Sequence, residues 1–91
     1  MKITVNVTAK DIREGQLAAS LVEGSAKTTV CAVARAFQRA TKDPAAYWMY
    51  SVGHSKSGVF EARNPKVNRF VEAHDHNKRV LPFKFKAERC K

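Results

Sequence analysis

Apolar and polar residues alternate at the start of the chain, over residues 2–8, and the apolar ones there are all β-branched. This period of two predicts a strand with one buried face. Thr8 can then cap a short helical turn over residues 9–14, with Gly15 as its end. Residues 16–27 show no firm period and are expected to form a loop.

The next pattern has the spacing of a helix. Its apolar positions are Val30, Val33, Ala34, Phe37 and Ala40. They form one stripe, which predicts an amphipathic helix that begins at Thr28 or Thr29. The helix should end at Asp43-Pro44, because proline cannot continue the hydrogen-bond ladder and restricts the residue before it.

A hairpin is predicted over residues 46–63. The first strand is the aromatic, β-prone run 47–52, the turn is the small-residue run 53–58, and the chain returns over 59–63.

Asn64 and Pro65 are a typical helix start, with asparagine as the N-cap and proline at the first helical position. The apolar and aromatic-like positions that follow at helical spacing are Val67, Phe70, Val71 and His74. Residues 80–89 then alternate again and predict a last strand, with Leu81, Phe83, Phe85 and Ala87 on one face. Pro82 near its start indicates an edge position or the first residue of pairing.

The predicted order is therefore β-α-β-β-α-β, an α+β fold in a single domain over residues 1–91. This order is typical of a ferredoxin-like split βαβ arrangement, a four-stranded sheet with two helices on one face. Right-handed crossovers are expected wherever connected strands are parallel. A related α+β sheet with a different strand order fits almost as well.

Four segments resemble those of short uncharacterised proteins from phages and bacteria. They are the MKITV-type opening 1–5, the Cys-led helix start 29–36, the second helix 65–71 and the VLPFKF-type close 80–85. The chain departs from that pattern in a longer 16–27 segment and in Ala32, where proline is expected after the cysteine. The resemblance implies a small phage-type accessory protein, in the cytoplasm of a bacterial host, with a role such as counter-defence. It transfers no activity and no site residue.

Charge narrows the class of partner. Seventeen lysines and arginines against eight aspartates and glutamates give a formal charge of +9, and such a field attracts polyanions. No apolar run is long enough to span a membrane, and the opening lacks the apolar region of a signal peptide. Two cysteines are too few for a disulfide-stabilised miniprotein. We therefore expect a soluble protein with no membrane partner.

Cations cluster in three places that could bind phosphate. The candidate phosphate-binding residues are Arg35, Arg39, Lys42, Lys56, Ser57, Lys84 and Lys86. The first three share a helical edge by their spacing, and the last two share one face of the final strand. The remaining pair lies in the glycine- and serine-rich run 53–58, whose backbone N–H groups suit an anion.

Aromatic residues of the hairpin could extend this basic surface. According to register, either Tyr47 and Met49 or Trp48 and Tyr50 would lie with the lysines on the open face of the sheet. Such a face resembles the stacking surfaces of single-stranded nucleic-acid readers. The ordinary alternative, which we favour, is that Trp48 and its neighbours are core.

Catalytic and metal-binding patterns are weak. His74 and His76 lack further ligands at metal spacing. Cys31 lies near a helix N-terminus, where a thiolate is favoured, but among apolar neighbours that suit a buried thiol. The carboxylates are scattered, so no acid–base pair can be nominated. We expect no enzyme activity, no metal and no cofactor.

The prediction is a non-catalytic binder of a phosphate-bearing ligand, with nucleic acid as the first choice. One alternative is a sponge that sequesters a small cyclic nucleotide or nucleotide-derived defence signal. Another is an inhibitor that docks on an acidic host or defence protein. A homodimer or higher oligomer is compatible with each of these functions.

Overall fold

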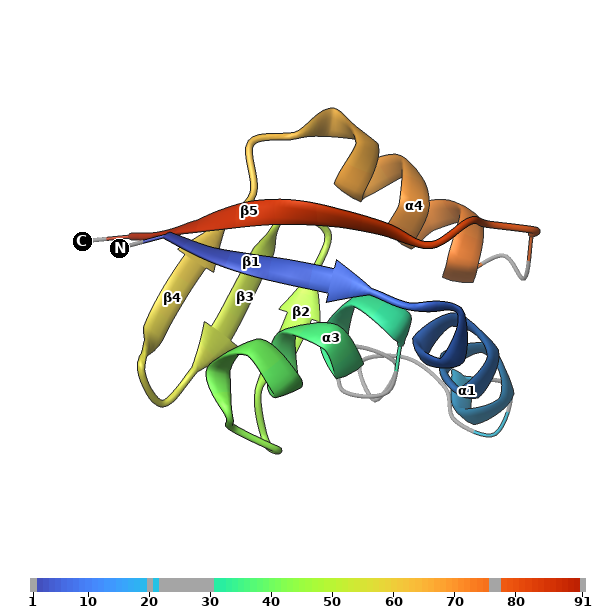
Figure 1. The fold of residues 1–91 in the computed structure, drawn as a ribbon, viewed down its shortest axis with the longest axis horizontal. Helices are drawn as coiled ribbons and strands as arrows, with labels where there is room; N and C mark the ends of the chain where they lie inside the picture. Colours follow the sequence, from blue (N-terminus) through green and yellow to red (C-terminus); the bar gives the residue numbers. More distant parts are fainter. Residues whose placement is uncertain (1, 20, 22–30, 76–77, 91) are drawn as a thin grey trace.

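The computed structural model describes residues 2–19, 21, 31–75 and 78–90. Within this part of the chain it shows three helices and five strands (Figure 1). In chain order they are β1 (Lys2–Val7), α1 (Ala9–Ala19), α3 (Ala32–Thr41), β2 (Tyr47–Met49), β3 (Val52–Ser55), β4 (Gly58–Glu61), α4 (Pro65–Asp75) and β5 (Phe83–Arg89). The predicted α+β class is confirmed.

The strands form one sheet in the order β1-β5-β4-β3-β2, and all four neighbouring pairs are antiparallel. The prediction of four strands was wrong, because residues 47–52 are not one strand. Tyr50 takes a left-handed backbone conformation, with φ of 55°, and the turn at 50–51 separates β2 from β3. Among the described strands no pair is parallel, so the expected right-handed crossover does not apply to them, and the ferredoxin-like order is not confirmed.

The hairpin turn is also shorter than predicted. Gly53, His54 and Ser55 belong to β3, and only Lys56 and Ser57 form the turn to β4. Gly53 serves packing instead of turning, because a Cβ atom there would meet the ring of Trp48 and lie 2.7 Å from the ring of Phe37. A side chain larger than hydrogen has no room at this position.

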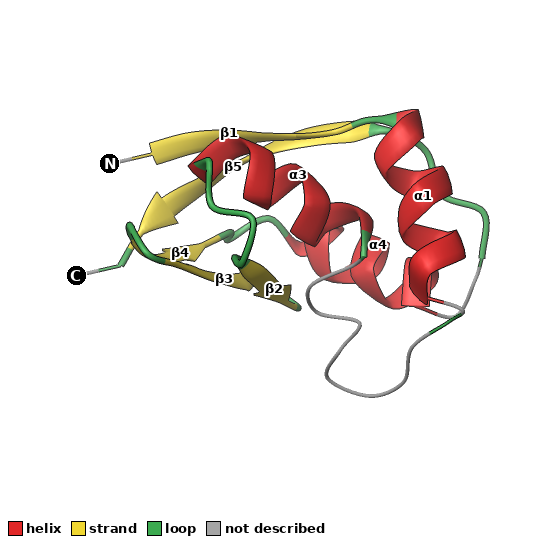
Figure 2. Ribbon diagram, turned by 90° about the horizontal axis from the view of Figure 1, so that it is seen from below, coloured by secondary structure: helices red, strands yellow, loops and turns green. Residues whose placement is uncertain are grey.

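The sheet is bent into two arms, with the helices on its inner side (Figure 2). One arm is the β1–β5 ribbon and the other is the meander β2–β3–β4. In the described part of the chain the arms pair at Phe60 with Arg89 and at Glu61 with Glu88, near the chain termini, and the Cys90 backbone N–H donates to the Val59 carbonyl at 2.7 Å. Phe37 of α3 lies in the angle, with ring centroids 5.1 Å from Trp48 and 5.7 Å from Phe60. The core therefore fills the space between the arms and leaves the outer face of each arm without a described helix against it.

The first helix starts as predicted but does not stop where predicted. Thr8 and Asp11 cap each other's backbone N–H groups, at 3.0 and 3.2 Å. The helix continues through Gly15 to Ala19, so Gly15 is no terminator. A Cβ atom at Gly15 would lie 2.6 Å from the backbone nitrogen of Ala32, so glycine permits the close approach of α1 to α3.

The stripe of α3 is confirmed for its described members. Val33, Ala34 and Phe37 are buried, and Cys31 is the N-cap. The predicted start at Thr28 or Thr29, together with Val30, lies outside the described residues. The helix ends at Thr41, before the predicted Asp43-Pro44 stop, and Lys42 is its left-handed C-cap with φ of 56°.

The start of α4 is as predicted, but the last strand is shorter than predicted. The Asn64 side chain accepts a hydrogen bond from the Lys66 backbone at 3.0 Å, and α4 begins at Pro65 as predicted. The last strand begins at Phe83 instead of residue 80. Leu81 is 69% exposed, so its predicted place on the buried face was wrong.

Candidate nucleic-acid interface

The outer face of the β1–β5 ribbon is polar along its whole length. Its residues are Lys2, Thr4, Asn6, Lys84, Lys86 and Glu88, and all six are exposed. Strand geometry explains this, because alternate side chains point to opposite faces. The intervening Val5, Val7 and Phe85 are buried in the core. Figure 2 shows the ribbon along one side of the molecule, with all three described helices on its other side.

Pairing of the two strands brings residues far apart in sequence side by side. Asn6 is paired with Lys84, and Thr4 with Lys86. At the other end of the ribbon, Lys2 faces Glu88. The two lysines of β5 thus lie next to two neutral side chains that can donate and accept hydrogen bonds. In the described part of the chain, neither lysine has an ion pair with a carboxylate.

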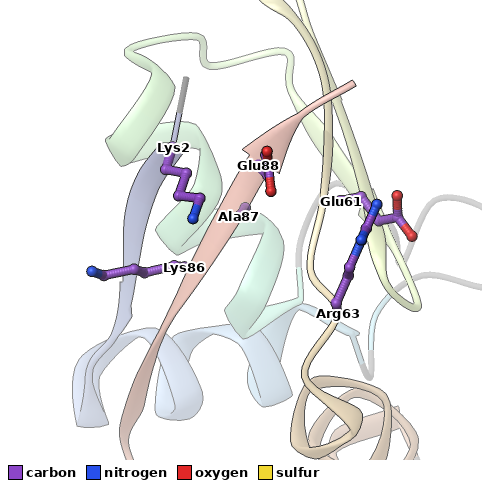
Figure 3. A pocket seen from close by; sticks show the side chains of 6 residues that line it. All are labelled: Lys2, Glu61, Arg63, Lys86, Ala87 and Glu88. Atoms are coloured by element: carbon purple, nitrogen blue, oxygen red, sulfur yellow. The ribbon is translucent and has the colours of Figure 1, made fainter. Parts of the chain in front are cut away.

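A shallow groove of about 140 Å³ continues this face at the bend of the sheet (Figure 3). Its lining residues are Lys2, Glu61, Arg63, Lys86, Ala87 and Glu88. Glu61 and Glu88 are directly opposite each other on β4 and β5, which is an unfavourable arrangement for like charges. Three cations around these two carboxylates offset that repulsion and leave the groove net positive.

Sequence reasoning missed Lys2, Thr4, Asn6 and Arg63 as members of this surface. The alternation over residues 2–8 does place the first three on one face. What the pattern could not show is that β1 pairs with β5, which puts this face beside Lys84 and Lys86.

Two of the predicted phosphate ligands, Arg35 and Arg39, form ion pairs with carboxylates of α1. Arg39 donates to both carboxylate oxygens of Asp11, at 3.0 and 2.7 Å, and to the backbone carbonyl of Asn6 at 2.7 Å. Arg35 pairs with Glu14. These contacts join α3 to α1 and to the end of β1. The assignment of both arginines to phosphate stays a prediction that no contact here supports.

The contacts of Asp11 lower the pKa of its carboxyl group. Burial alone raises its pKa, but the hydrogen bonds from Arg39 and Thr8 and the arginine charge outweigh burial and hold the pKa below its ordinary value. The hydrogen bonds to Asp11 and the charge of its carboxylate raise the pKa of Arg39. Asp11 and Arg39 therefore form a charged pair that joins α1 to α3.

Lys42, Lys56 and Ser57 lie in another part of the fold. Asp43, next to Lys42, accepts hydrogen bonds from the backbone of Lys56 at 2.8 Å and of Ala45 at 3.0 Å. These bonds lower the pKa of Asp43. The Ser57 hydroxyl lies 3.1 Å from that of Ser55. These residues form a second exposed basic area at the β3–β4 turn, at the opposite end of β4 from the groove.

The aromatic residues do not join the lysines of β5. Trp48 is core, and its indole N–H donates to the Tyr50 carbonyl at 2.6 Å. Tyr47 lies on the outer face of the meander and stacks on His54, with ring centroids 4.8 Å apart. Along the sheet, two strands lie between β2 and β5, and Tyr47 and the lysines of β5 lie on the outer faces of different arms. The predicted combination of stacking and phosphate contacts on one surface is not formed.

The cysteines and histidines are the remaining candidates for chemistry. Cys31 is buried, and its sulfur accepts a hydrogen bond from the Ala34 backbone at 3.5 Å. Cys90 is exposed, and neither cysteine forms a disulfide. His74 is buried, stacked on Phe70 at 5.9 Å, and His76 lies outside the described residues.

Metal-ligating side chains do not gather in the part of the chain that the structure describes: no group of three or more His, Cys, Asp or Glu side chains comes together there. No helix in the same residues is long and apolar enough to cross a membrane.

Comparison with known proteins identifies no relative. No family model, no curated protein and no solved structure matches the chain. The resemblance to short phage and bacterial proteins therefore stays a prediction.

Proposed function

We propose that this protein binds nucleic acid, without catalysis, through the outer face of the β1–β5 ribbon. One observation carries the proposal: Lys2, Lys84, Lys86 and Arg63 meet on one polar surface that no described helix covers. The buried side of the same ribbon belongs to the core, so the surface is held in shape before a ligand arrives.

The spacing of the lysines suits a chain of phosphates. Residues two apart on a strand are separated by about 6.8 Å, and one strand of a duplex carries one phosphate per about 3.4 Å of helix axis, so Lys84 and Lys86 can each neutralise a different phosphate. Each phosphate that a lysine neutralises releases counterions, and this release supplies sequence-independent affinity. Exposed lysines with no ion pair in the described part of the chain are available for this role, unlike Arg39, which is already paired with a carboxylate.

The volume and charge of the hollows at the bend favour nucleic acid over a sequestered small nucleotide. Sites that enclose small molecules usually have about 300–1,000 Å³, whereas this groove has about 140 Å³. A second hollow that shares Glu61, Arg63 and Glu88 with the groove has about 320 Å³, but its lining also includes Arg89 and Cys90, so two carboxylates offset its two cations and it offers no net positive charge to a small anion. The alternative of an inhibitor that docks on an acidic protein is supported only by the positive charge of this surface.

Charge reversal at two positions tests the proposal. We expect the double variant Lys84→Glu, Lys86→Glu to lose at least tenfold in affinity for a labelled DNA, measured by fluorescence anisotropy at low salt. The matched control is Lys66→Glu, Arg69→Glu, which changes the net charge equally on exposed positions of α4. Equal losses in both variants would show attraction by net charge alone and would overturn the assignment of the site.

A further inference from the structure

We infer that the preferred ligand is duplex DNA and that the β1–β5 ribbon enters its major groove. This inference rests on the proposed function and specifies its ligand. The major groove of B-form DNA is about 12 Å wide and admits a two-stranded β-ribbon. The β1–β5 pair is such a ribbon: it runs as six consecutive register pairs, from Lys2 with Glu88 to Val7 with Phe83. Of its described residues, Glu88 and Arg89 of β5 pair with β4, and the rest of the ribbon pairs with no further strand.

The side chains on the outer face match what a groove presents. Asn6 and Thr4 occupy the middle of β1 and are exposed. Asparagine forms paired hydrogen bonds with the adenine edge, and threonine contacts either a polar edge or the thymine methyl group. Lys84 and Lys86 lie directly across from them on β5. Long lysine side chains from this strand can reach guanine edges or the phosphates beside the groove.

The composition of the outer face disfavours single-stranded nucleic acid, and the shape of the ribbon disfavours double-stranded RNA. Its six residues include no aromatic side chain on which an unpaired base could stack, and stacking is a main source of affinity for single strands. Tyr47 and His54, a stacked pair on an outer face, belong to the other arm. Double-stranded RNA fits poorly, because its major groove is deep and too narrow for side chains to read.

Contacts on the inner side of the ribbon also hold its backbone in place. Val5, Val7 and Phe85 pack into the core, and the Arg39 guanidinium holds the Asn6 carbonyl at 2.7 Å. The Asn6 side chain therefore starts from a backbone that is already positioned. A rigid ribbon loses little conformational entropy on binding.

The test compares four ligands of one sequence: duplex DNA, the same duplex with 7-deazapurines, double-stranded RNA and single-stranded DNA. The 7-deaza change removes the N7 acceptors of the major groove and leaves the phosphates unchanged. We expect duplex DNA to bind at least tenfold more tightly than each of the other three. Asn6→Ala should remove most of the difference between the two DNA duplexes, about tenfold for one paired contact. The matched control Asn68→Ala, on the exposed side of α4, should keep it.

The outcomes separate the two proposals. If all four ligands bind equally and the Lys84 and Lys86 variants weaken each of them, the protein binds backbone phosphates and insertion into the groove is refuted. If single-stranded DNA binds most tightly, insertion is refuted in favour of a stacking surface. If none of the four binds at low salt, both the inference and the proposed function are overturned.

Discussion

Replacing Arg39 by methionine removes the guanidinium that joins α3 to α1 and to the end of β1. The wild-type side chain makes two hydrogen bonds to the Asp11 carboxylate and one to the Asn6 carbonyl. Methionine keeps much of the apolar stem but no donor. The variant leaves a carboxylate whose side chain is only 5% exposed without its cationic partner.

The expected cost follows from these contacts. A hydrogen bond to a charged group contributes about 1.5–3 kcal/mol, and loss of one partner of a fully buried ion pair costs about 3–5 kcal/mol. The Arg39 side chain is 53% exposed, so water screens the pair. We therefore expect the free energy of unfolding to fall by about 2 kcal/mol, towards the lower end of these ranges. For a chain of this size that corresponds to a loss of roughly 8–16 °C in Tm.

Urea unfolding followed by the fluorescence of Trp48 measures this change, because Trp48 is the only tryptophan and is buried in the core. The control is Arg69→Met on α4, which should change stability by less than about 0.5 kcal/mol. A double-mutant cycle with Asp11→Asn should give a coupling energy of about 1–2 kcal/mol. Equal stability of Arg39→Met and wild type, or a coupling energy near zero, would refute the structural role.

Three further predictions concern two carboxylates, the contact of α1 with α3 and the two cysteines. The pKa values of Asp11 and Asp43 lie below the ordinary 3.8 in the folded protein, so their contribution to stability is complete above that value and is lost as pH falls through the lower folded pKa values. Urea titrations below about pH 4 should show this loss, and a flat profile would contradict it. Gly15→Ala should destabilise the protein by about 1–3 kcal/mol, although alanine favours helices, because its Cβ meets the backbone of α3; a more stable variant would show that the helices are not in close contact. A thiol reagent should modify Cys90 rapidly and Cys31 only as fast as the protein unfolds, and rapid modification of both would place Cys31 outside the core.

Local signals in the sequence predicted most of the helix starts and the first strand. Thr8 with Asp11, and Asn64 with Pro65, mark helix starts through contacts within three residues, which a sequence pattern shows directly. The alternation of the last strand likewise placed Lys84 and Lys86 on the exposed face. To predict these features, one needs only the period of a helix or strand and a capping residue.

The errors arose where distant contacts decide the structure. Gly15 was interpreted as the end of a helical turn and Gly53 as part of a hairpin turn, but each permits a close approach of another element. The turn at Tyr50 carries no glycine, so the pattern gave no reason to divide residues 47–52.

The candidate site could be predicted only in part, for the same reason. Arg39 and Asp11 are 28 residues apart, and no spacing rule shows that they pair. The pairing of β1 with β5, which brings Asn6 next to Lys84, is of the same long-range kind.

The most direct test of the proposed interface is an NMR titration of the protein with a short DNA duplex. Amide resonances of β1 and β5, from Lys2 to Val7 and from Phe83 to Arg89, should shift together with that of Arg63, and those of α4 should stay in place. Shifts confined to the β3–β4 turn around Lys56, or to the exposed side of α4, would contradict binding at the outer face of the ribbon.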